Sequence, residues 1–155
     1  MNKVDGKQLK EQMWEAELDR RKFEQYRKWV AADGGEVTEE DFEDSRTEFS
    51  ILHESEFLRN VVKIVTEHKL TGKFGCSLDQ RFLSLATGVS ERLFADLIEK
   101  EDDESIRSII SATVGEFEFS RRALDYYGIS FFLTITGNAS DMYDLGEGYY
   151  YFNHC

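Results

Sequence analysis

The stretch ESEFLRNVVKIVTEHKL, residues 54–70, decides the fold class of this chain. Its apolar residues recur at helical spacing and cover a face broad enough for a helix at the centre of a core: Phe57, Leu58, Val61, Val62, Ile64 and Val65. The chain contains no proline, the strongest helix breaker, so long helices can form without interruption. We therefore expect a mostly helical protein built around this segment.

Other helices are predicted on both sides of residues 54–70. A long N-terminal helix over residues 5–32 has an apolar residue at every seventh position, namely Leu9, Ala16, Phe23 and Val30. A short acidic helix is expected to begin after Thr38, with Asp41 completing its cap, and to run toward Phe49. Downstream, helical patterns cover residues 78–87, 90–101 and 105–114, while residues 116–127 fit either a strand or a helix.

The C-terminal residues differ in character from the rest. Residues 129–136 and 149–153 are rich in β-branched and aromatic side chains, and glycine-containing turns separate them. This pattern predicts a β-hairpin with a long loop over residues 129–153. Together with a helical body over residues 38–127, it indicates one α+β domain over residues 1–155, with five or six helices and a C-terminal hairpin.

The chain is strongly acidic, with a formal net charge of −12 and a pI near 4.7. Nucleic acids and anionic membranes attract Lys and Arg, so we expect neither as a direct partner. The charge is also uneven: residues 1–30 carry eight basic and six acidic residues, and the remainder carries eleven and twenty-five. A basic protein surface is the partner that such a charge distribution favours.

The cysteines and the hydropathy indicate a cytoplasmic protein. Cys76 and Cys155 lie far apart and do not form a CxxC pair, so no disulfide framework or zinc site is expected. The first residues lack the apolar run of a signal peptide, and no window approaches eighteen consecutive apolar residues.

We find no motif that carries catalysis or binds a cofactor. Phosphate-binding, dinucleotide-binding and serine-hydrolase motifs are absent from the sequence, and the three histidines lack metal-ligand spacing: His53, His68 and His154. Cys76 would need His53 or His68 folded against it to act as a nucleophile. We therefore expect no cofactor and no metal, and favour a binding protein. A small enzyme or metabolite binder whose site only the fold assembles stays an alternative.

Residues 80–98 follow the rhythm of two short helices separated by a turn. They resemble the helix-turn-helix of the lambda-repressor and Cro family at Leu83, Ser84, Thr87, Gly88, Val89, Ser90, Phe94 and Leu97. The resemblance implies a transcriptional regulator as a second alternative. However, the second helix carries Glu91, Asp96 and Glu99, which DNA phosphates would repel, so we predict no binding to duplex DNA.

The candidate partner-binding residues lie in the acidic region after the first helix. Ten acids and one base, Arg46, fall between Asp33 and Glu56. We predict that the partner binds Glu39, Glu40, Asp41, Glu43 and Asp44, together with Tyr149 and Tyr151 on the outer side of their strand. The predicted function is a small acidic regulator or inhibitor that binds another protein. Phage-encoded inhibitors, DNA mimics and immunity proteins share this size and acidity and the lack of catalytic motifs.

The apolar stripe of the N-terminal helix leaves two arrangements open. The stripe would pack on its own domain or on a second copy of the chain, and the second arrangement would give a homodimer. Phe23 lies in the middle of the stripe, so its environment distinguishes the two.

Overall fold

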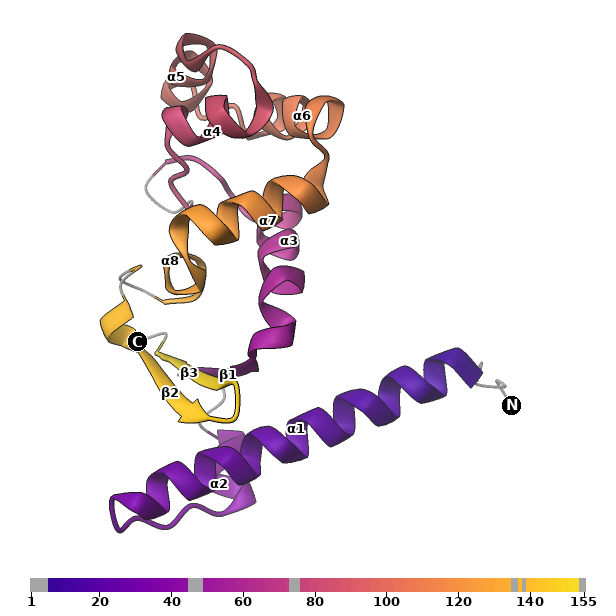
Figure 1. Cartoon of the computed structure of the whole chain (residues 1–155), viewed down its shortest axis with the longest axis vertical. Coiled ribbons are helices and arrows are strands. Elements are labelled where there is room, and N and C mark those ends of the chain that lie inside the picture. Colours follow the sequence, from indigo (N-terminus) through magenta and orange to yellow (C-terminus); the bar gives the residue numbers. More distant parts are fainter. Residues whose placement is uncertain (1–5, 45–48, 73–75, 135–136, 138, 154–155) are drawn as a thin grey trace. The chain divides into compact units, whose positions relative to one another are not determined.

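The computed structural model describes residues 6–44, 49–72, 76–134, 137 and 139–153. Contacts within the chain divide it into two compact units (Figure 1). Unit 1 contains Met1–Glu54 and Met142–Cys155, and unit 2 contains Ser55–Asp141. The single domain over residues 1–155 remains a prediction.

Unit 1 combines two helices with a three-stranded antiparallel sheet. The helices are α1 (Gly6–Ala32) and α2 (Glu39–Asp44), and the strands are β1 (Phe49–His53), β2 (Met142–Gly146) and β3 (Tyr149–Asn153). The strand order is β1-β3-β2, so the C-terminal strand lies in the middle. Its register on β1 pairs Phe49 with Asn153 and His53 with Tyr149.

The C-terminal half of α1 covers one face of this sheet (Figure 1). Leu18, Phe23, Tyr26 and Trp29 recur at helical spacing and pack against a core cluster that consists of Phe42, Phe49, Ile51, Leu145 and Tyr149. The Tyr26 ring stacks on Phe49 at 5.2 Å and on Tyr151 at 6.0 Å. Phe23 therefore packs within its own unit.

Unit 2 is helical. After the 3₁₀ turn η1 (Glu54–Glu56), it contains α3 (Phe57–Glu67), α4 (Gln80–Thr87), α5 (Glu91–Glu99), α6 (Asp103–Thr113), α7 (Glu116–Tyr127), α8 (Ile129–Leu133) and η2 (Ala139–Asp141). Val61 and Val65 of α3 are fully buried, as are Phe119 and Ala123 of α7. The helix predicted from residues 54–70 is thus a core helix, and α3 packs chiefly on α7.

The structure confirms a mostly helical α+β fold with a C-terminal antiparallel strand pair, and it corrects the hairpin. The strand that forms the hairpin with β3 is Met142–Gly146, whereas Ile129–Leu133 forms α8. A short apolar run fits either a strand or a buried helix, and the sequence pattern does not separate them. The strands β2 and β3 are joined by a two-residue turn, Glu147-Gly148, in which both residues have positive φ.

Three further differences concern the helices and β1. The described part of the chain contains eight α-helices rather than five or six, and the ambiguous residues 116–127 form α7. The acidic helix ends at Asp44 and not near Phe49, because residues 49–53 pair with β3 about a hundred residues downstream. Residues 135–136 of the predicted first hairpin strand lie outside the described residues.

Candidate interaction surfaces

The acidic helix α2 is held in a defined position by its cap and by one buried ring. The Asp41 amide donates to Thr38 Oγ1 at 3.2 Å, and the Thr38 amide donates to Asp41 Oδ2 at 3.4 Å, which is the reciprocal cap predicted from the sequence. Phe42 is buried and contacts Phe23 and Tyr26 of α1, with ring centroids 5.4 and 5.6 Å away. The aromatic anchor fixes which face of α2 points to solvent.

The remaining side chains of this helix present negative charge. Residues 33–44 contain seven acids and no basic residue. Glu36 and four of the predicted site residues in this segment are exposed: Glu39, Glu40, Asp41 and Glu43. Asp44 is the last residue of α2, and its side chain lies outside the described part. The structure thus brings four of the predicted acids onto one short, anchored helix.

The tyrosines of β3 do not occupy the outer position predicted for them. Tyr149 is 6% exposed and packs edge-on against His53, with ring centroids 4.8 Å apart. Tyr151, on the same face, is half-buried and stacks on Phe49 at 4.8 Å. The outward orientation was therefore wrong for Tyr149. Alternation along a strand separates the two faces of a sheet, but α1 decides that this face belongs to the core.

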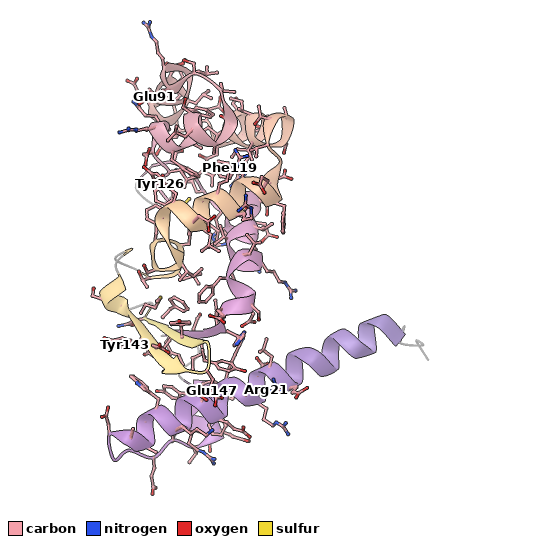
Figure 2. The ribbon with its side chains drawn as sticks, viewed as in Figure 1. Arg21, Glu91, Phe119, Tyr126, Tyr143 and Glu147 are labelled. Atoms are coloured by element: carbon pink, nitrogen blue, oxygen red, sulfur yellow. The ribbon has the colours of Figure 1, made fainter. Side chains whose placement is uncertain are left out.

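Tyr143 of β2 is the exposed tyrosine of this unit that the sequence reasoning missed. Its side chain is 43% exposed, and its ring lies 5.9 Å from Trp29 and 5.7 Å from Tyr151 (Figure 2). Its position in the predicted loop concealed it, because the partner strand of β3 was placed too early. Deeper in the same aromatic group, burial raises the pKa of Tyr26.

Within the described residues, the structure assembles neither the metal site nor the cysteine nucleophile considered from the sequence. Among the described residues, no three His, Cys, Asp or Glu side chains come together in a way that could hold a metal ion. Burial raises the pKa of the Cys76 thiol to about 11, and the charge of Asp103 adds to this effect. A reactive nucleophile needs a lowered thiol pKa, so this environment does not activate Cys76.

The two helices that resemble a helix-turn-helix do form with the expected turn. Asp79 caps α4 by accepting from the Phe82 amide at 2.7 Å, and Gly88 ends it in the left-handed region at φ 76°. Asp79 also accepts a hydrogen bond from the Tyr127 hydroxyl at 2.9 Å, which ties the start of α4 to the end of α7. Burial chiefly raises the pKa of Tyr127.

The exposed face of α5 is acidic, as the sequence indicated. Glu91, Asp96 and Glu99 are all exposed, and the Lys100 ammonium lies 2.9 Å from the Asp96 carboxylate (Figure 2 labels Glu91). This ion pair offsets one of the few cations that could contact a phosphate. Such a surface opposes insertion into a DNA groove.

The comparisons with known proteins add no functional information. No protein-family model matches the chain, and no curated protein or solved structure is significantly similar to it. Among the described residues, no helix combines the length and the apolar character needed to cross a membrane.

Proposed function

We propose that this protein is a small acidic regulator or inhibitor that binds a basic surface of another protein. The observation that carries the proposal is the acidic segment of residues 33–44, defined by seven acids without a basic residue and held in place by Phe42. The partner surface it fits is cationic, such as the DNA-binding groove of another protein.

The geometry of α2 supports binding rather than a role in solubility alone. Charges that only keep a protein soluble need no fixed position, whereas these are displayed by a capped helix on a buried aromatic anchor. Among the described residues, Glu39 and Glu40 form no ion pair within the chain. Binding a basic partner would therefore require no internal ion pair of these two side chains to break.

A preorganised acidic surface acts mainly on the rate of encounter. Opposite potentials raise the association rate constant, and salt screens that attraction over about 10 Å at 0.1 M ionic strength. We expect binding that becomes slower as salt increases. Tyr143, exposed in the same unit, supplies an aromatic contact in place of the buried Tyr149.

The test is quantitative affinity capture from the native host, followed by kinetics with the purified partner. The bait variant replaces the five predicted acids by amides: Glu39→Gln, Glu40→Gln, Asp41→Asn, Glu43→Gln and Asp44→Asn. The matched control removes five exposed acids from unit 2 by Glu67→Gln, Glu91→Gln, Glu99→Gln, Glu101→Gln and Glu104→Gln.

Both variants change the net charge equally, so only position distinguishes them. We expect the α2 variant to lose the partner and to show a lower association rate with a weaker salt dependence. The control variant should keep most of the wild-type rate. Equal effects of the two variants would show that net charge, and not α2, determines binding.

The two alternatives have less support from the described residues. A helix-turn-helix regulator has the required turn at Gly88, but the acids on α5 oppose phosphate contact. For a small enzyme or metabolite binder, the depression between α1 and β1 measures only about 180 Å³, and the larger one of about 720 Å³ is an open hollow lined by residues of the single helix α6. Small-molecule sites are commonly about 300 Å³ or larger and enclose most of the ligand.

A further inference from the structure

A groove with apolar walls lies between α4 and α7 in unit 2. It measures about 340 Å³ and is lined by Phe82, Leu85, Ala86, Arg122, Asp125 and Tyr126. Phe82 is buried, whereas Leu85 is 67% exposed and Tyr126 is 53% exposed. Single exposed apolar residues are common on protein surfaces, but two large ones that line the same groove indicate a contact surface.

The groove is already formed without a partner. The Tyr126 ring packs on Phe82 at 4.9 Å and on Tyr127 at 4.8 Å, which holds it beside α4 (Figure 2). Arg122 Nη1 donates to the carbonyl of Ala86 at 2.8 Å and joins the two helices across the groove. A partner would therefore meet positioned side chains, which lowers the entropy lost on binding.

The charge beside the groove differs in sign from that of the chain as a whole. Arg81 precedes Leu85 by one helical turn and is exposed on the same side of α4. In the part of the chain that the structure describes, its guanidinium has no hydrogen bond or ion pair. Arg122 lies 3.2 Å from Glu118, and Asp125 lies 3.5 Å from Arg121, so both of these charges are offset within α7 and Arg81 supplies the unpaired cation. A carboxylate on the ligand would fit this edge.

We propose that the groove binds an acidic amphipathic helix of a partner protein. Apolar side chains of that helix would contact Leu85 and Tyr126, and a carboxylate would lie beside Arg81. The eight residues of α4 extend about 12 Å, which matches roughly two turns of a docked helix with anchors at i, i+3 or i+4 and i+7. The groove is open to solvent, whereas a small molecule needs walls that bury most of its surface.

This proposal does not depend on the function proposed for α2. The groove is in unit 2 and attracts a negative ligand, whereas α2 is in unit 1 and attracts a positive one. The two surfaces can therefore succeed or fail separately in experiments on the same full-length chain.

The test uses a phage-displayed library of 15-residue helical peptides with variable surface positions, selected on the full chain. The selected peptides are synthesised with a fluorescent label, and their affinities are measured by anisotropy. We expect them to be acidic and to carry apolar residues at i, i+4. Leu85→Ala and Arg81→Glu should each weaken binding at least about fivefold.

The matched control is Phe117→Ala. Phe117 is also on α7 and is 63% exposed, but it precedes Tyr126 by nine residues and so faces the opposite side of the helix. This change should leave the affinity unaltered. Leu85 is mostly exposed, so its replacement preserves the fold, and circular dichroism verifies this for every variant.

Four results would overturn the proposal. They are a failure to select any helical peptide, selection of basic peptides, equal binding to the Leu85→Ala variant, and equal loss in the Phe117→Ala control. A dilution series of the free protein followed by NMR adds a fifth. Amide shifts at Leu85 and Tyr126 that change with concentration would show that a second copy of the chain occupies the groove.

Discussion

The hydrogen bonds between Asp79 and Tyr127 should couple the start of α4 to the end of α7. The Tyr127 hydroxyl accepts from the Asp79 amide and donates to Asp79 Oδ2, both at 2.9 Å, while Asp79 Oδ1 caps α4. Tyr127→Phe removes only the hydroxyl, because the ring stays stacked on Phe131 at 4.2 Å. Asp79→Ala removes the cap as well as the acceptor.

The expected magnitudes follow from the exposure of these groups. Asp79 is exposed, so water can replace the lost partner, and Tyr127→Phe should lower the free energy of unfolding by about 1 kcal/mol. For a chain of this length that corresponds to a fall in Tm of roughly 3 °C. Asp79→Ala should cost about 2 kcal/mol, since it also loses a helix N-cap. The double variant should cost about 2.5 kcal/mol, because Asp79→Ala keeps the backbone amide that donates to the Tyr127 hydroxyl, and the coupling energy should therefore be about 0.5 kcal/mol.

Urea denaturation of the wild type, the two single variants and the double variant measures this coupling. The matched control cycle uses Asp102→Ala in place of Asp79→Ala. Asp102 caps α6 by accepting from the Ser105 amide at 3.1 Å and has no hydrogen bond to Tyr127. The effects of Asp102→Ala and Tyr127→Phe should add. A coupling energy below about 0.3 kcal/mol in the Asp79 cycle, or an equal one in the control cycle, would refute the reasoning.

The remaining predictions concern pH, packing, backbone conformation and thiol reactivity. The pKa of Tyr127 is raised in the folded state, so the neutral hydroxyl contributes its full share of the folding stability below the unfolded pKa of 10.0. This share is lost as the pH rises above that value. The free energy of unfolding above pH 10 should therefore fall more steeply in the wild type than in Tyr127→Phe. Phe23→Ala should lower the free energy of unfolding by about 2 kcal/mol and leave the mass measured by light scattering unchanged. A wild-type dimer that dissociates on Phe23→Ala would contradict intramolecular packing. Glu147→Asn should stabilise the protein by about 0.5 kcal/mol in thermal unfolding, because Asn tolerates a φ of 56° better than Glu, and a lower Tm would count against this turn. In a Cys155→Ser background, alkylation of Cys76 at about pH 8 should be about a hundredfold slower than alkylation of a cysteine in a model peptide. The reason is that a rise in the thiol pKa from 9.0 to about 11 lowers the thiolate fraction by that factor. Alkylation at the peptide rate would show an exposed thiol.

Local features of the structure were predictable from the sequence. The apolar face of residues 54–70 indicated a core helix, and Val61 and Val65 are fully buried. Thr38 and Asp41 form the expected cap, and Gly88 ends α4 before the second helix of the pair. Each of these depends on residues within one or two helical turns, whose spacing and hydrogen-bonding capacity are visible in the sequence.

The acids of α2 are exposed on an anchored helix, and their charge predicts a basic partner. The groove between α4 and α7 could not have been found from spacing, because Leu85 and Tyr126 lie on helices separated by two others along the chain. A leucine at this position in α4 is equally compatible with a buried site.

The sequence by itself determined the mostly helical character, the caps at Thr38 and Gly88 and the distribution of charge, because these depend on near neighbours and on composition. Only the tertiary structure decided that residues 49–53 form a strand, since their partner, β3, lies about a hundred residues away. It also decided that Tyr149 is buried and Tyr143 exposed: both rings lie on the face of the sheet that α1 covers, but Tyr149 is on the central strand β3 and Tyr143 is on the edge strand β2. Strand pairing and burial depend on contacts between distant segments, and a periodic pattern does not specify which distant segment supplies the contact.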